Sequence, residues 1–239
     1  MIEFDNTLVV ITAAMSGKSL PGTPMLDVNG KPLVLHAVHE AELAKLGKVL
    51  VATPDLRVAD AVRAGGGDAL VCLPSTAQSA QAAAVLSMRD PARTVTHVVV
   101  MPCTLASIEH LSLRRCLAGL LNPGVDAATI VVEAADVPPG RITATAPITP
   151  EREAAYLRSL ARSEGSRGGL QLIPVYSWTR GALERFAARP ALPQEQEPGL
   201  ELLRALAGGL RCVAVKVDSL PLSVDTADNL AVFRQLLKA

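Results

Sequence analysis

The feature that most constrains the fold of this chain is the alternation of short apolar runs with helical patterns along its first half. Near-continuous runs rich in Val, Ile and Leu are each followed by a segment of helical spacing. Strands of this kind are typical of a parallel sheet covered by helices on both faces, with right-handed crossovers. The alternation therefore predicts an α/β fold, a three-layer α/β/α sandwich around a mostly parallel sheet. The predicted strand and helix pairs are 8–12 with 33–46, 49–52 with 56–64, 69–72 with 77–88, and 98–101 with 108–121.

The second half of the chain interrupts this pattern before returning to it. After a strand at 127–132, the segment from about 136 to 169 is rich in Pro, Thr, Ser and Arg, and we expect it to form an arm of a single domain spanning 1–239. Within the arm we predict a helix from Glu151 to Arg162, capped by Thr149, and a flexible tail at 163–169. The sheet then resumes at 170–176, followed by helices at 180–188 and 200–207, a strand at 212–217 and a helix at 227–237.

Composition excludes several classes of function. The 23 basic and 23 acidic residues give no net charge, and no basic cluster with interleaved aromatics indicates nucleic-acid binding. No run is long enough to cross a membrane and no signal peptide is visible, so we expect a cytoplasmic protein. The 4 cysteines lack a CxxC spacing, which favours core packing over zinc binding or disulfides.

The order of the elements and several short motifs resemble the CMP-Kdo synthetase (3-deoxy-manno-octulosonate cytidylyltransferase) family, within the nucleotide-sugar pyrophosphorylase fold. The resemblance covers nearly the whole chain. It implies transfer of a cytidylyl group from CTP to a sugar acid, with release of pyrophosphate, Mg²⁺ bridging the phosphates, and a homodimer. The motifs are Leu20-Pro21-Gly22-x-Pro24, Asp27-x-x-Gly30-Lys31-Pro32, Val51-Ala52-Thr53 with Val58-Ala59-Asp60-Ala61-Val62, Gln78-Ser79, Leu200-Glu201-x-Leu203-Arg204, and Val224-Asp225-Thr226-x-Asp228-x-Leu230.

The same resemblance implies the positions of the site. It places the nucleotide against the loop after the first strand and the start of the third helix, the sugar against later segments, and the metal on a carboxylate near the carboxyl terminus. The candidates are Ala13, Ala14, Lys18, Gly22, Gln78, Ser79 and Cys103 for the nucleotide, Gln171, Glu195 and Glu201 for the sugar, and Asp225 for the metal.

The chain departs from the family pattern where charge is needed. Ala14, Ser19 and Thr23 stand where the family has cationic side chains, and Lys18 is the one residue of that loop able to compensate. Cys103 stands near the family's magnesium-binding Asp, and a thiol is a poor ligand for hard Mg²⁺. We therefore expect a degenerate relative that has lost or nearly lost catalysis and acts by binding a ligand or a partner.

Other interpretations stay open at this point. A rebuilt but active nucleotidyltransferase site could use Lys18, Asp27, Arg141 and Asp225, or the chain could be a scaffold subunit with no small ligand. Asp225 precedes a predicted helix, so that it or Thr226 could be a helix cap instead of a metal ligand. Cys103, at the end of a strand, could be a reactive thiol.

Overall fold

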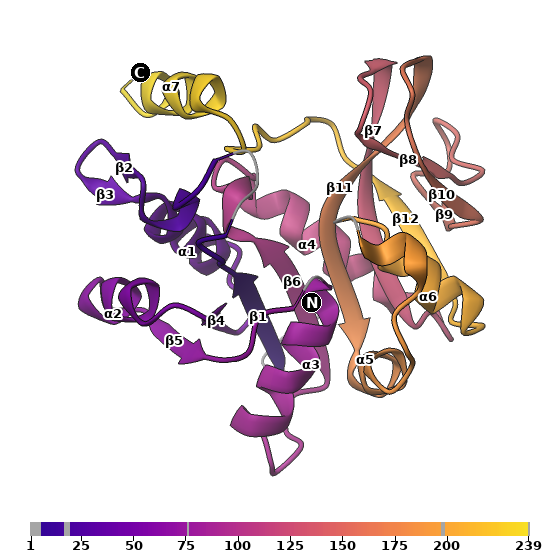
Figure 1. The fold of residues 1–239 in the computed structure, drawn as a ribbon. Coiled ribbons are helices and arrows are strands. Elements are labelled where there is room, and N and C mark those ends of the chain that lie inside the picture. Colours follow the sequence, from indigo (N-terminus) through magenta and orange to yellow (C-terminus); the bar gives the residue numbers. More distant parts are fainter. Residues whose placement is uncertain (1–5, 17–19, 76, 197–198, 239) are drawn as a thin grey trace.

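The computed structural model describes residues 6–16, 20–75, 77–196 and 199–238, and within them ten strands form one sheet (Figure 1). The order along the sheet is β5-β4-β1-β6-β11-β7-β12-β9, with β8 on β11 and β10 on β8. The strands are β1 (Thr7–Thr12), β4 (Lys48–Thr53), β5 (Asp68–Val71), β6 (His97–Pro102), β7 (Ala127–Val137), β8 (Ile142–Thr145), β9 (Ala154–Tyr156), β10 (Ser159–Arg162), β11 (Ser166–Thr179) and β12 (Cys212–Lys216).

The sheet is mostly parallel in its first half and mixed in its second. β5, β4, β1 and β6 run parallel to one another, and β12 runs parallel to β7. β11 is antiparallel to both β6 and β7, and so joins the two parallel groups. A separate two-stranded ribbon, β2 (Asp27–Val28) with β3 (Lys31–Pro32), precedes the first helix.

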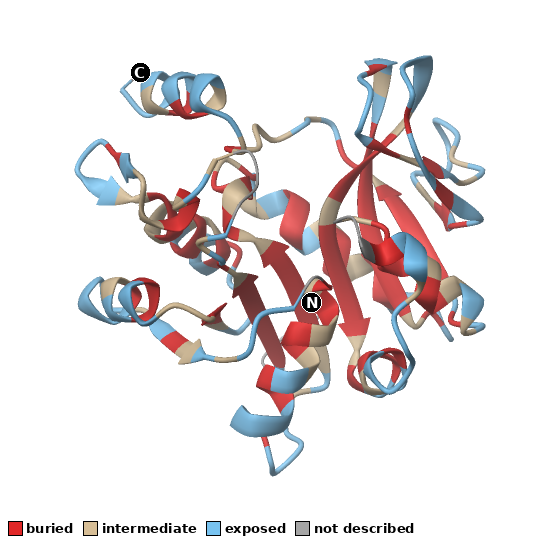
Figure 2. Cartoon of the chain, viewed as in Figure 1, coloured by how far each residue is buried: buried red, intermediate tan, exposed pale blue. Residues whose placement is uncertain are grey.

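Helices cover both faces of the sheet, which confirms the predicted three-layer sandwich. The buried side chains of α1 (Leu33–Leu43), α2 (Leu56–Ala64), α4 (His110–Ala118) and α7 (Ala227–Leu236) belong to one apolar core. Those of α3 (Gln78–Arg89), α5 (Arg180–Ala187) and α6 (Leu202–Ala207) belong to a second core. Figure 2 shows the sheet buried between helices whose outer sides are exposed.

The strands read as continuous apolar runs because each contributes to both cores. In β1, Val9 and Ile11 pack into the first core, whereas Leu8 and Val10 pack into the second. All four side chains are 5% exposed or less. A strand buried on both faces needs apolar residues at every position, and this is why the first half of the sheet could be predicted from the sequence.

The structure of the arm differs from two predictions. The helix expected from Glu151 to Arg162 is wrong, because this segment forms β9, which pairs with β12, and β10, which pairs with β8. In β10, Leu160 is buried while Ser159, Ala161 and Arg162 are exposed, as expected of a short strand at the edge of the sheet. Thr149 forms an isolated bridge with Arg152 and caps no helix. The tail predicted to be flexible is partly strand, since β11 begins at Ser166 and pairs with β7.

The described helices and the cysteines bear on two expectations from the sequence. No helix in the described ranges is long and apolar enough to cross a membrane. All 4 cysteines are free thiols, and Cys103, Cys116 and Cys212 are buried. The prediction that the cysteines pack in the core instead of forming disulfides therefore holds for these three, while Cys72 is half-buried.

Candidate functional site

The carboxyl ends of β1 and β6 bring the first predicted nucleotide residues together. Thr12 pairs with Pro102 in parallel register, so Ala13 and Cys103 leave the sheet at the same edge. Ala13 is buried and continues the ladder by donating its N–H to the Ala52 carbonyl at 3.0 Å, whereas Ala14 is exposed. The Thr12 hydroxyl donates to Gln78 Oε1 at 3.3 Å. The edge predicted to hold the nucleotide is therefore built from β1, β6 and the start of α3.

The loop that follows β1 is closed by Gly22. Its N–H donates to the Met15 carbonyl at 2.9 Å, and its φ of 77° lies in the left-handed region that favours glycine. A tight turn into the short helix at Thr23–Met25 depends on this conformation. Lys18 and Ser19 lie outside the described residues, so the expected compensation by Lys18 stays a prediction.

Ser79 and Glu201 meet at the amino end of α3, although 122 residues separate them in the sequence. Ala77, the residue before the helix, has no side chain able to cap it. Instead Glu201 accepts the Ser79 N–H at 3.0 Å and the Ser79 hydroxyl at 3.1 Å, while Trp178 Nε1 donates to Ser79 Oγ at 3.0 Å. Burial raises the pKa of Glu201 to about 7, despite the bonds from Ser79 that favour its charged form.

Glu195 is engaged in a second buried contact. Its Oε1 accepts the Arg204 Nε–H at 2.8 Å and the Leu192 N–H at 2.9 Å. The Arg204 guanidinium lies 4.3 Å from the centre of the Phe186 ring. Glu195 and Glu201 are 3% and 4% exposed, so both predicted sugar ligands point into the protein, and their role with a sugar stays a prediction.

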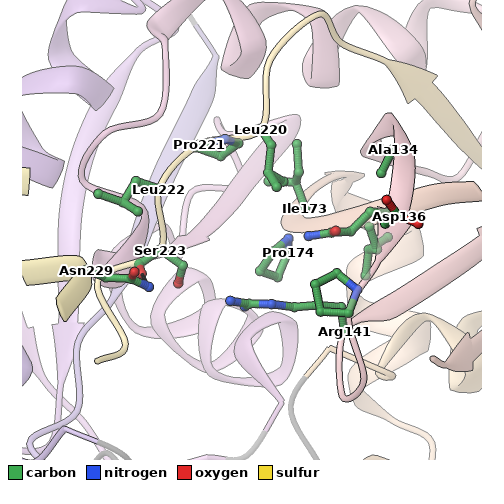
Figure 3. Close-up of a pocket in the computed structure, with 13 residues that line it drawn as sticks. Ala134, Asp136, Arg141, Ile173, Pro174, Leu220, Pro221, Leu222, Ser223 and Asn229 are labelled. Carbon is green, nitrogen blue, oxygen red and sulfur yellow. Dashed lines mark hydrogen bonds between the residues drawn. The ribbon is translucent and has the colours of Figure 1, made fainter. Parts of the chain in front are cut away.

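A cavity of about 420 Å³ lies between the β7–β11 ribbon and the segment that leads into α7 (Figure 3). Its polar groups come from Asp136, Arg141, Gln171, Ser223 and Asn229. The remaining wall is apolar. Gln171 is thus the one predicted sugar residue that the structure places in this cavity. The apolar lining consists of Ala134, Pro138, Leu172, Ile173, Pro174, Leu220, Pro221 and Leu222.

Asp225 lies beside this cavity and next to the turn that contains Cys103. The Val224 N–H donates to the Thr104 carbonyl at 2.9 Å, which fixes the segment before α7 against the turn Cys103–Leu105. Asp225 Oδ2 accepts Arg141 Nη1 at 3.2 Å, and Oδ1 accepts Asn229 Nδ2 at 3.0 Å. The structure therefore brings the two predicted metal-region positions, Cys103 and Asp225, to one edge.

The open question of the helix cap is settled by Thr226. Its side chain accepts the Asn229 N–H at 3.2 Å, as an N-cap does, whereas Asp225 caps no backbone N–H. The contact from Asn229 to Asp225 was missed in the sequence analysis. Asn229 stands three residues after the cap, where a helical side chain leans back towards the amino terminus, and that position is the signal that could have revealed it.

Cys103 and Asp225 fit a Mg²⁺ site poorly, because one is a thiol and the other is a carboxylate that is paired within the protein. Cys103 is 3% exposed, and burial raises the pKa of its thiol to about 12, so that it stays protonated at neutral pH. Mg²⁺ prefers carboxylate and water oxygens, and both oxygens of Asp225 already accept N–H groups. The described part of the chain contains no group of three His, Cys, Asp or Glu side chains that could hold a metal ion.

Comparisons with known proteins agree with this arrangement. A sequence profile described as cytidylyltransferase matches residues 8–151. The 3-deoxy-manno-octulosonate cytidylyltransferase of Nitrobacter winogradskyi is 35% identical over 98% of this chain and 94% of its own length. That of Rhodopseudomonas palustris is also 35% identical, over 97% of both chains.

Solved structures show the same fold. A CMP:2-keto-3-deoxy-manno-octonic acid synthetase complexed with CTP superimposes with a TM-score of 0.82 at 24% identity, covering 98% of this chain and 99% of that one. A UDP-glucose pyrophosphorylase complexed with UDP-glucose gives a TM-score of 0.69 at 12% identity, covering 98% of each chain. The full-length similarity in sequence, together with this fold, confirms the resemblance drawn from the motifs: the chain belongs to the 3-deoxy-manno-octulosonate cytidylyltransferase family.

Proposed function

We propose that this protein is a family member in which Mg²⁺-dependent cytidylyl transfer is lost or nearly lost, and which acts by binding a ligand or a partner. The observation that carries the proposal is the edge formed by Cys103 and Asp225. A buried neutral thiol stands at one position, and a carboxylate already paired with Arg141 and Asn229 stands at the other. Nucleotidyl transfer depends on cations that neutralise phosphate charge, and this edge offers only that one paired carboxylate to hold such a cation.

The expected reduction in rate is large enough to favour loss of activity over a modest reduction. Removing one preorganised charge contact from a desolvated site costs about 10²–10³ in rate. The loop after β1 lacks cationic side chains at Ala14 and Thr23, in addition to the altered metal position. Thr23 is buried, and its hydroxyl donates to the Leu20 carbonyl, so this position packs the loop and presents no group to a phosphate.

The relatives suggest which ligands to examine first. One solved structure of this fold was obtained with CTP, and the curated relatives are named for 3-deoxy-manno-octulosonate. We propose these two molecules, or close analogues, as ligands of this protein. The 420 Å³ cavity beside Asp225 lies within the range of about 300–1,000 Å³ that small-molecule sites occupy.

Turnover tests the proposal directly. Pyrophosphate release from CTP and 3-deoxy-manno-octulosonate with Mg²⁺ should be at least about 10³-fold slower than for the Nitrobacter winogradskyi relative under the same conditions. Turnover at about 1–10³ s⁻¹, the ordinary enzyme range, would instead establish an active enzyme with a rebuilt site. A melting temperature that neither CTP nor the sugar acid raises would favour a scaffold without a small ligand, because a ligand of the folded state must stabilise it.

We also propose a homodimer, as the family resemblance implies. The sequence predicts its contact near the helix at 200–207 and the loop at 194–198, but the side chains of Glu195, Glu201 and Arg204 are buried within one chain and cannot supply it. The exposed strands of the arm offer a surface instead. Light scattering over a dilution series should give twice the 25.0 kDa chain mass, and a constant 25.0 kDa species would exclude the dimer.

A further inference from the structure

We infer that Arg141 supplies the positive charge of this site in place of a divalent cation, so that the adjoining cavity binds a small polyhydroxylated molecule through its carboxylate or phosphate without metal. The inference rests on the proposed loss of Mg²⁺-dependent transfer, and it assigns a ligand class and a recognition residue to the site that remains.

The contacts of Asp225 show what has taken the place of the metal. Arg141 Nη1 lies 3.2 Å from Oδ2, and Asn229 Nδ2 lies 3.0 Å from Oδ1. Each of the two carboxylate oxygens therefore already has one N–H donor within the protein. Asn229 is itself held, because its Nδ2 also donates to the Ser223 carbonyl at 2.7 Å and its N–H donates to Thr226. The carboxylate is therefore already neutralised and oriented by the protein.

The backbone of Arg141 is anchored where the arm leaves the sheet. Its carbonyl accepts the Ser163 N–H at 2.7 Å, and its own N–H donates to the Pro138 carbonyl at 3.3 Å. From this position the side chain crosses the floor of the cavity, and its guanidinium points towards Ser223 and Asn229 (Figure 3). The bond to Asp225 thus links the arm to the segment before α7.

The Arg141 guanidinium has N–H groups beyond the one that contacts Asp225, and these can donate to a ligand. Arg141 has five side-chain N–H groups, and in the described part of the chain its ion pair with Asp225 is made through Nη1. The Arg141 side chain is 44% exposed, so a ligand can reach it. A planar guanidinium binds carboxylate or phosphate with paired hydrogen bonds, and a cation held by a neighbouring carboxylate is already oriented to do so.

The rest of the cavity matches a polyhydroxylated molecule. Arg141 is the single cationic side chain among the described lining residues, and Figure 3 shows Asp136 at the opposite side, beside Ala134. Asp136 can accept hydrogen bonds from hydroxyl groups. The buried Gln171 amide and the Ser223 hydroxyl can each donate and accept hydrogen bonds. The apolar wall of Ile173 and Pro174 offers a surface for the carbon face of a ring.

Isothermal titration in EDTA tests the inference with two probes, 3-deoxy-manno-octulosonate for a carboxylate and CMP for a phosphate. At least one should bind, and Arg141→Gln should weaken that binding at least about tenfold, since the substitution removes the charge and the paired donors. The probe that binds identifies which oxyanion the site takes. Arg89→Gln is a matched control, because Arg89 forms an ion pair of the same 3.2 Å length with Asp68 and has a similar exposure, outside the cavity.

Three results would overturn the inference: no binding of either probe in EDTA, binding that requires Mg²⁺, or equal loss in Arg141→Gln and Arg89→Gln. Arg141→Lys keeps the positive charge but not the planar pair of donors, and it should retain part of the affinity. None of these outcomes depends on turnover. A protein that releases pyrophosphate would refute the proposed function, whereas an inactive protein that binds a probe with equal loss in Arg141→Gln and Arg89→Gln would refute only the role of Arg141.

Discussion

At the scale of single residues, the account depends on the protonation and packing of Cys103. Its thiol sits at the end of β6, at the edge where parallel sheets bind ligands, yet it is buried against the first apolar core. Burial raises the pKa of Cys103, Cys116 and Cys212 to about 12. The interpretation of Cys103 as a reactive thiol is therefore disfavoured, because nucleophilic attack needs the thiolate.

The cysteines should differ in their reaction with iodoacetamide. In the native protein at pH 8, Cys72 should be alkylated first, because it is half-buried, whereas the other three are enclosed. Peptide mass spectrometry over a time course would measure the order. In Cys72→Ser the fast phase should disappear. Labelling of Cys103 at the rate of Cys72 would show that the Cys103 thiol is accessible and would contradict its placement in the core.

At the scale of elements, the amino ends of two helices are capped in different ways. One cap lies next to its helix in the sequence, and the other lies far from it. The start of α7 is capped locally by Thr226, which the sequence analysis named as one of two possibilities. The start of α3 is capped by Glu201, from a segment 122 residues away. A local motif can be recognised in the sequence, but a distant carboxylate that reaches a helix end through the folded chain cannot.

Substitutions at the start of α7 should separate the roles of its two candidate caps. Thr226→Ala should lower the free energy of unfolding by about 1 kcal/mol, the usual loss for a cap. Asp225→Asn should change it by less than about 0.5 kcal/mol, because the Asp225 contacts to Arg141 are partly exposed and an amide can still accept a bond from Asn229. Urea unfolding measures both, and a larger loss for Asp225→Asn would reverse the assignment of the cap.

The contact between Glu201 and α3 should make stability depend on pH. Burial raises the folded-state pKa of Glu201 from 4.5 to about 7, so the folded state holds this proton more tightly than the unfolded state. The contribution to stability is fully present below about pH 4.5 and is lost as the pH rises through about 7. Relative to Glu201→Gln, which cannot ionise, the wild type should therefore lose a few kcal/mol of unfolding free energy across this window.

Trp178 gives a direct signal for this measurement. The sequence has 1 tryptophan, and its side chain is fully buried. The indole N–H donates to the Ser79 hydroxyl, which in turn donates to Glu201. Urea unfolding followed by its fluorescence should be run on both proteins between pH 4.5 and 8. A stability difference that stays constant with pH, or that grows in favour of the wild type as the pH rises, would contradict the raised pKa.

At the scale of the whole molecule, the sandwich and its edge were predictable, whereas the arm and the interior of the site were not. Strands such as β1 are apolar at every position because both faces are buried, and this signal survives in the sequence. The segment of β9 and β10 has a helix-like composition, but pairing with β12 and β8 decided its structure. Contacts such as Arg141 with Asp225, 84 residues apart, arise only when the arm folds back on the sheet.

The central claim is that this site works without a divalent cation, and titration of CTP with Mg²⁺ and then with EDTA tests it most directly. The Nitrobacter winogradskyi relative serves as the reference protein. For the wild type, we predict the same CTP affinity within about twofold in the two buffers, and no change on Asp225→Asn, since Asp225 is bound to Arg141 and Asn229. An affinity that Mg²⁺ raises tenfold or more, and that Asp225→Asn abolishes, would show that Asp225 still holds the metal and would contradict the account.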